Sequence, residues 1–217
     1  MKTSIIKLAI STAVASTLTV GLPSNANATL ITFDDLTAGA AVTKGYGGLD
    51  WTYVNGKSTT SFYVLDSALS QYSSTGYANA DVSATNVAYN AYGATAEIST
   101  ATSPSFTLNS GYFTGAYNDG LSITAQATTV GGLTETQTFK VNTTGPTKEV
   151  FNFGKITSIS YISSGGTTKT GLSCSACNVF AMDNLTINAP VPEPETYGMM
   201  LAGLGLMGFM LRRKSSV

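Results

Sequence analysis

The residues whose chemistry could define a function are few in this chain of 217 residues. It contains no histidine, which excludes Ser-His-Asp and Cys-His nucleophiles, an imidazole general base and histidine-ligated zinc. What remains is one cysteine pair, several carboxylates with amide neighbours, and a large set of tyrosines. These residue types favour a binding or structural role over catalysis.

The two cysteines, Cys174 and Cys177, have Cys-x-x-Cys spacing. In an exported protein an even pair is typical of a disulfide, here one that pins the loop before the last predicted strand. A thioredoxin-like redox motif needs a βαβ context, and zinc binding needs further Cys or His ligands. The sequence therefore predicts a local disulfide, with the redox and metal interpretations as weaker alternatives.

Carboxylates occur at both ends of the predicted strand series. Asp34 and Asp35 follow the first strand, and Asp183 and Asn184 lie in the last one. If these strands are neighbours, their oxygens form a set that suits calcium, so a structural calcium site is one interpretation, and no cofactor is required. The alternative is that the four side chains cap turns and accept hydrogen bonds from backbone amides.

Tyrosines offer a second kind of site, because sugar rings present apolar C–H faces that can stack on aromatic rings. We predict ligand contacts from Tyr46, Tyr117, Asn118 and Asp119, which lie near glycine-rich turns. The alternative is that tyrosines fill the core and its rim. Trp51 is expected in the core. The other aromatic candidates are Tyr53, Tyr63, Tyr72, Tyr77, Tyr89, Tyr92 and Tyr112.

The elements that must position these residues are strands. Short runs rich in β-branched and aromatic residues alternate with Gly, Asn and Ser clusters, and no stretch has a sustained helical repeat. The pattern predicts an all-β, two-sheet antiparallel β-sandwich, specifically a jelly roll. The predicted strands are 30–33, 49–54, 61–65, 86–92, 105–108, 121–128, 133–141, 149–153, 156–162 and 179–187.

The first 28 residues have the order of a secretory signal peptide. Lys2 and Lys7 precede a mostly apolar or small stretch at 8–22, and Ala26 and Ala28 form a small-x-small cleavage site. We therefore expect an N-terminal signal helix at 1–28 that is removed on export, and a β-sandwich domain at 29–189.

The C-terminal end also carries an address. The sixteen uncharged residues 196–211 would span about 24 Å as a helix, slightly less than a hydrocarbon core of about 30 Å. The basic tail 212–214 can snorkel at one membrane interface and favours the cytoplasmic side. We predict a single transmembrane helix at 197–211, with the body outside the membrane.

Ahead of that helix stand Pro192, Glu193 and Pro194, and after it Arg212 and Arg213. This order, with a glycine-rich helix between, resembles the PEP-CTERM sorting signal of bacterial exported proteins, here at 190–217. The resemblance implies recognition by an exosortase, a membrane sorting protease. It also implies a transient inner-membrane intermediate that is delivered to the cell surface, outer envelope or extracellular matrix.

Local patterns in the body, among them 31–36, 46–51, 113–121 and 179–185, resemble domains often found ahead of such tails. Those domains look like galactose-binding-type jelly rolls, which implies association with glycan or exopolysaccharide, as in a biofilm matrix. The body contains six lysines, ten carboxylates and no arginine, a net charge of −4. Without basic stripes or guanidinium groups, we expect no nucleic-acid partner.

Taken as a whole, the sequence predicts a non-enzymatic exported surface or matrix protein. A protein–protein adhesion or matrix module is the first alternative. Glycosidase activity would need a carboxylate pair across a cleft, and no local catalytic motif surrounds the available acids. Ice binding would need a regular array of threonines, and the threonine pairs of this chain have no constant period.

Overall fold

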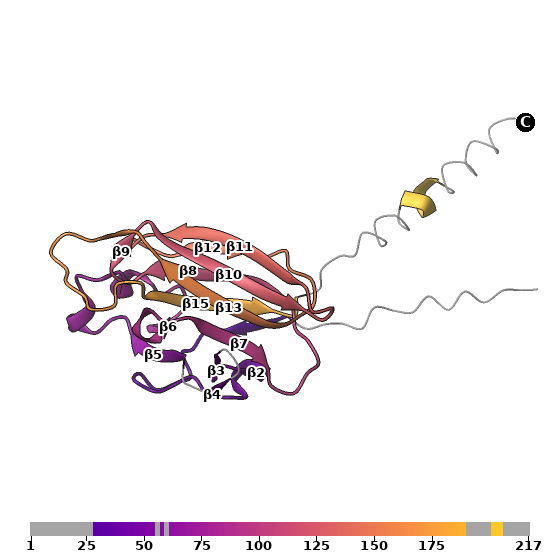
Figure 1. Cartoon of the computed structure of the whole chain (residues 1–217), viewed down its shortest axis with the longest axis horizontal. Coiled ribbons are helices and arrows are strands. Elements are labelled where there is room, and N and C mark those ends of the chain that lie inside the picture. Colours follow the sequence, from indigo (N-terminus) through magenta and orange to yellow (C-terminus); the bar gives the residue numbers. More distant parts are fainter. Residues whose placement is uncertain (1–27, 55–56, 59–60, 190–200, 206–217) are drawn as a thin grey trace, which may run out of the picture.

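The computed structural model describes residues 28–54, 57–58, 61–189 and 201–205. Between 28 and 189, its regular structure consists of β-strands and four short 3-10 helices, and the main strands form two antiparallel sheets (Figure 1). The long strands of both sheets run along the length of the body (Figure 1). The predicted all-β class with two antiparallel sheets is confirmed.

One sheet contains six strands, with the last strand of the chain near its centre. Its order is β12 (Thr147–Val150), β8 (Leu108–Gly115), β15 (Phe180–Ile187), β6 (Asn86–Asn90) and β5 (Phe62–Asp66), and β1 (Thr29–Ile31) also pairs with β15. The first and last strands are therefore neighbours, as the sequence analysis assumed.

The second sheet contains five strands. Its order is β11 (Thr134–Val141), β10 (Leu121–Thr129), β13 (Ile156–Ser164), β7 (Ala96–Thr100) and β2 (Leu49–Asp50). Two short pairs complete the strands: β9 (Asn118–Asp119) with β14 (Thr167–Thr168), and β3 (Tyr53–Val54) with β4 (Lys57–Ser58).

The main core fills the space between the two sheets. Alternation along β10 sends Leu121, Ile123, Ala125 and Ala127 inward, and all four are completely buried. From the opposite sheet, the Phe113 ring lies 5.6 Å from the Tyr161 ring and 5.0 Å from the Phe139 ring, between centroids. Aromatic contacts of this kind add to the area that each ring buries.

Trp51 lies in this core, as expected. It is completely buried, its Nε1–H donates to the carbonyl of Tyr46 at 2.8 Å, and its ring meets Phe33 and Phe62 edge-on. Its indole N–H therefore has the partner that a buried tryptophan requires. The ring is not available as a platform for ligands.

Strand β7 and most of β8 were not predicted. Strand β8 contains Gly111 and Gly115, residues that normally weaken a strand. Here they are needed for close approach, since a Cβ on Gly111 would collide with Leu185 and one on Gly115 with the carbonyl of Asn118. The glycines that hid this strand in the sequence are therefore part of its packing.

A second, smaller hydrophobic cluster lies outside the interior of the sandwich. Its buried members include Leu65, Val87 and Ala181 from the six-stranded sheet, on the face opposite the main core. The segment with η2 (Ser70–Tyr72) and η3 (Gly76–Asn79) contributes Tyr77 to the same cluster. The outer face of this sheet is thus partly covered by aromatic side chains.

The predicted signal peptide, apart from its last residue, and nearly all of the sorting tail lie outside the described residues. Residues 201–205, within the predicted membrane helix 197–211, are α-helical. Among the residues that the structure describes, no helix has the length and apolar character needed to cross a membrane. The membrane helix stays a prediction.

The burial of Trp51 gives a stability test. We expect Trp51→Ala to lower the free energy of unfolding by about 3–5 kcal/mol, because it opens a cavity at the rim of the aromatic core. Leu133→Ala, at a side chain that is 72% exposed, should change it by no more than about 0.5 kcal/mol. Urea unfolding followed by circular dichroism measures both, and equal effects would contradict the assignment of Trp51 to the core.

Candidate ligand-binding pocket

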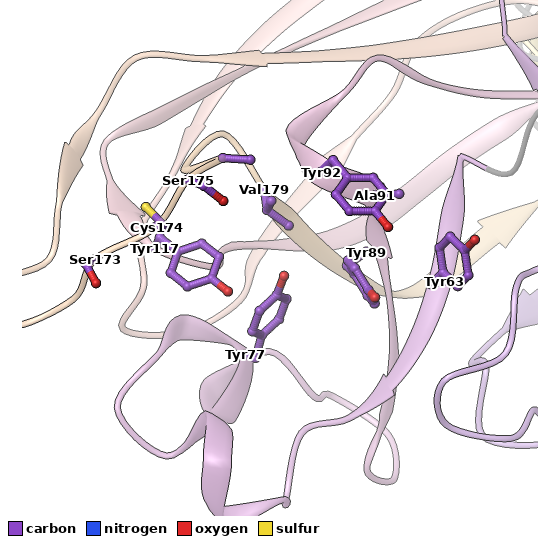
Figure 2. Close-up of a pocket in the computed structure, with 11 residues that line it drawn as sticks. Tyr63, Tyr77, Tyr89, Ala91, Tyr92, Tyr117, Ser173, Cys174, Ser175 and Val179 are labelled. Atoms are coloured by element: carbon purple, nitrogen blue, oxygen red, sulfur yellow. The ribbon is translucent and has the colours of Figure 1, made fainter.

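A pocket with a cavity volume of about 470 Å³ opens over the outer aromatic cluster (Figure 2). This volume lies within the range of about 300–1,000 Å³ that is typical of small-molecule sites. The lining residues come from six separate segments of the chain: Tyr63, Tyr77, Tyr89, Ala91, Tyr92, Tyr117, Ser173, Cys174, Ser175, Ala176 and Val179.

Strand alternation places the first two tyrosines of the pocket. Phe62 and Val64 of β5 belong to the main core, so Tyr63 between them points to the outer face of the sheet. Tyr63 pairs directly with Tyr89 of β6, and their ring centroids lie 6.2 Å apart. The β5–β6 register therefore sets two neighbouring rings in the pocket wall.

Tyr77 forms the floor. It is only 4% exposed, and its ring makes edge contacts with Tyr89 and Tyr117, each at 5.7 Å between centroids. The hydroxyl of Thr75 accepts a hydrogen bond from the Tyr77 backbone at the start of η3. Burial raises the pKa of Tyr77 and of Tyr89 above the ordinary phenol value, so both remain neutral hydroxyl groups at physiological pH.

Tyr92 stands at the mouth of the pocket, in η4 (Ala91–Gly93). It is 85% exposed, and its φ of 55° lies in the left-handed region, which costs a tyrosine about 1–3 kcal/mol. Gly93 follows with φ 65°, and a Cβ there would crowd the backbone of Asn178. The fold thus holds an exposed aromatic ring in a strained turn against the neighbouring loop.

That neighbouring loop is closed by a disulfide. Cys174 and Cys177 are bonded, with their Cα atoms 5.4 Å apart, so the disulfide prediction is confirmed. Cys174, Ser175 and Ala176 line the pocket, and Cys174 and Ser175 lie across it from Tyr63 and Tyr89 (Figure 2). The sequence predicted the bond but not that its loop forms a pocket wall.

Asn90 ties the turn and the loop together. It is completely buried, and its amide nitrogen donates to the carbonyl of Ala94 at 3.0 Å and to the hydroxyl of Ser163 at 3.3 Å. Its amide oxygen accepts from the backbone of Phe180 at 2.8 Å, while the Ser163 hydroxyl donates to the carbonyl of Asn178. One satisfied amide therefore fixes both sides of the pocket mouth.

Of the four predicted ligand residues, the structure places only Tyr117 in the pocket. Tyr46 lies elsewhere, where its hydroxyl donates to Asp35 at 2.7 Å and accepts from the backbone of Phe33 at 3.1 Å. Its ring packs against the main core. These contacts give Tyr46 a structural role, and its predicted ligand contact stays a prediction.

The other two predicted ligand residues also hold the fold together. Asn118 is 5% exposed, and its amide donates to the carbonyl of Gly165 at 2.9 Å. Asp119 accepts from the backbone and the hydroxyl of Thr143, at 2.7 and 2.8 Å, and these bonds hold its pKa below the ordinary value. Both side chains have hydrogen-bond partners within the protein, and neither lines the pocket, so their assignment to ligand binding stays a prediction.

The carboxylates predicted to bind calcium instead anchor the segment 82–86. Asp183 is completely buried and accepts hydrogen bonds from the backbone of Val82 at 2.7 Å and Ser83 at 3.0 Å. Burial raises the pKa of Asp183, against the effect of these hydrogen bonds. Asp34 accepts from the backbone of Ala84 and Asn86, at 3.3 and 3.2 Å.

The electrostatics of Asp34 agree with this role. Burial alone would raise the pKa of its carboxyl, but hydrogen bonds from Ser83, Ala84 and Asn86 outweigh burial and lower it. Asp35 is paired with Tyr46, and Asn184 adopts φ 49° where the β15–β8 register shifts. The described residues contain no group of three or more His, Cys, Asp or Glu side chains that could hold a metal ion. The contacts of these residues match the turn-capping interpretation, and the calcium site stays a prediction.

Strand pairing also gathers threonines that the sequence scatters. On the outer face of the five-stranded sheet, alternate residues of β11 pair with alternate residues of β10, namely Thr134 with Thr128, Thr136 with Gln126 and Thr138 with Thr124. Gln126 takes the place of a threonine in the second of these pairs, so the threonines do not form a regular array. This face adds no support to ice binding.

The comparisons with known proteins identify the tail. Residues 190–214 match the PEP-CTERM protein-sorting motif, in agreement with the resemblance found in the sequence. The motif supports an exported surface protein that passes through the membrane and is processed by an exosortase. This match covers the tail and leaves the body unassigned.

For the body, no curated protein matches. One similar solved structure is a DUF4465 family protein from Bacteroides ovatus ATCC 8483, with 12% identity over 76% of this chain and 95% of that chain, and a TM-score of 0.43. That score is too low for the neighbour to assign a function to this chain.

The hydrogen bonds of Asp34 and Asp183 lead to a prediction about metal dependence. Because backbone amides occupy these carboxylates, the melting temperature should be the same within about 1 °C in millimolar calcium and in excess chelator. Asp34→Asn, which keeps an acceptor oxygen, serves as the comparison variant. A calcium-dependent rise of several degrees that disappears in this variant would support the metal site.

Proposed function

We propose that the body is a glycan-binding module of the cell surface or extracellular matrix, that it acts without catalysis, and that the tyrosine pocket is its binding site. The observation that carries the proposal is the group of phenol rings around a cavity of about 470 Å³ at the outer face of one sheet. The sorting motif supports an exported surface protein, and a glycan-binding module suits that location. Exopolysaccharide is accordingly the proposed partner.

The chemistry of the lining residues suits sugars. Tyr92 and Tyr89 offer partly exposed ring faces for stacking on apolar C–H surfaces, and their hydroxyls can exchange hydrogen bonds with a saccharide. Tyrosine has few rotatable bonds, so it loses little conformational entropy when it contacts a ligand. Ser173 and Ser175 add further hydroxyls on the opposite wall.

A binding role is favoured over hydrolysis by what surrounds the cavity. The described lining contains no carboxylate, whereas a glycosidase needs two of them beside the scissile bond. Asp34, Asp119 and Asp183, three of the acids formally available for such a role, accept hydrogen bonds from backbone amides. These contacts support a non-enzymatic module.

We further propose that the sandwich is a galactose-binding-like jelly roll. Two observations support this assignment. The strands β6, β7, β8 and β10 alternate between the two sheets, as do β11, β12, β13 and β15, and the first strand lies beside the last. Crossing connections of this kind are typical of jelly rolls.

The pocket gives a direct mutational test on a glycan array. We expect Tyr92→Ala in the full chain, kept in mild detergent, to weaken binding to the bound glycan about tenfold or more, because it removes the most exposed ring. Tyr112→Ala is the matched control, since Tyr112 lies beneath Lys148 at 5.7 Å and does not line the pocket. Equal loss in both variants would contradict the assignment. Self-association without glycan binding would favour the protein–protein adhesion alternative.

The disulfide wall gives a second test. The double variant Cys174→Ser, Cys177→Ser should bind the same glycan several-fold more weakly, because the loop of Ser173, Ser175 and Ala176 loses its covalent closure. The loop is short, so unfolding free energy should fall by only about 2 kcal/mol. Calorimetric titration and thermal melts separate the two effects, and unchanged affinity would show that the loop does not contact the ligand.

A further inference from the structure

We infer that the pocket selects neutral saccharides and excludes acidic ones such as uronates. This inference deepens the proposed function and rests on it. Its basis is the chemical nature of the lining residues together with the distribution of charge over the body.

The described lining residues contain no group that is charged at neutral pH. They are five tyrosines, two serines, two alanines, a valine and a disulfide-bonded cysteine. Burial raises the pKa of Tyr77 and Tyr89, so these phenols do not ionise under physiological conditions. The pocket therefore offers rings and hydrogen-bonding hydroxyls, which are suited to uncharged ring hydroxyls and C–H faces.

Among the described residues that line the cavity, none is a cation that could receive a carboxylate. Lys169 is bound to one lining residue through its backbone, whose N–H donates to the carbonyl of Tyr117 at 2.9 Å. Its ammonium group donates to the carbonyl of Ser74 at 3.0 Å and is thus directed to the backbone beside η2. Lys169 is absent from the residues that line the cavity.

An acidic sugar would then pay for partial desolvation of its carboxylate without gaining an ion pair. Burying an unpaired charge costs much more than burying a hydroxyl group that finds a hydrogen-bond partner. The body also carries six lysines, ten carboxylates and no arginine, so its long-range field repels anionic polymers. Local chemistry and overall charge therefore act in the same direction.

The test compares two β-linked oligosaccharides of equal length, a neutral glucan and the corresponding glucuronan, by calorimetric titration of the full chain in mild detergent. The neutral oligosaccharide should bind at least tenfold more tightly, with an affinity that changes little between low and high salt. Tighter or equal binding of the glucuronan would overturn the inference and leave glycan binding intact. Absence of binding to either, and to a wider neutral panel, would overturn the proposed function as well.

A pair of variants in the disulfide loop makes the test specific to the pocket. Ser175 is exposed and lines the cavity, so a longer side chain there should not disturb the fold. We expect Ser175→Lys to improve glucuronan binding at least tenfold in low salt and to lose this gain in high salt. Ser175→Gln, of similar length but uncharged, should show no such gain. The same gain in both variants would contradict a selectivity based on charge.

Discussion

The body depends on the insertion of its last strand into the middle of a sheet. Strand β15 pairs with β8 on one side and with β6 and β1 on the other. It therefore joins the two halves of the six-stranded sheet. It also carries Asp183, which anchors the segment 82–86, and Phe180, whose backbone N–H is held by Asn90. The core, the anchored loop and the pocket mouth therefore share one strand.

The position of β15 separates the folded body from the sorting tail. The strand ends at Ile187, and the two residues that follow are still bound to the body. Asn188 and Thr107 exchange two hydrogen bonds, and the backbone of Ala189 donates to the side chain of Asn109 at 2.9 Å. The sorting motif begins at residue 190, directly after these contacts. Removal of the tail beyond this point would leave every strand pair of the body in place.

The sequence predicts the fold class and most strands because alternation and β-branched residues report directly on which face of a sheet is buried. The sequence does not predict β8, because Gly111 and Gly115 lower its strand propensity. Both glycines are needed there because the chain packs closely against Leu185 and Asn118. The disulfide follows from spacing and an export signal. The pocket cannot be predicted from the sequence, because its rings come from β5, β6, η3, η4 and the segment before β9, which only the fold brings together.

The carboxylates show the same limit of prediction from sequence. Asp34 follows β1 and Asp183 lies in the neighbouring strand β15, as expected, yet the segment 82–86 supplies amide donors that sequence reasoning could not place there. Asp34, Asp119 and Asp183 thus satisfy backbone amides, and the exposed turn that carries Tyr92 lies beside a cavity with no charged residue in its described lining. A protein whose surface is solvated by serine and threonine hydroxyl groups more than by charged side chains can form such a cavity without charged side chains beside it. Charged residues make up only 11% of the chain, and the described lining of the candidate site contains none.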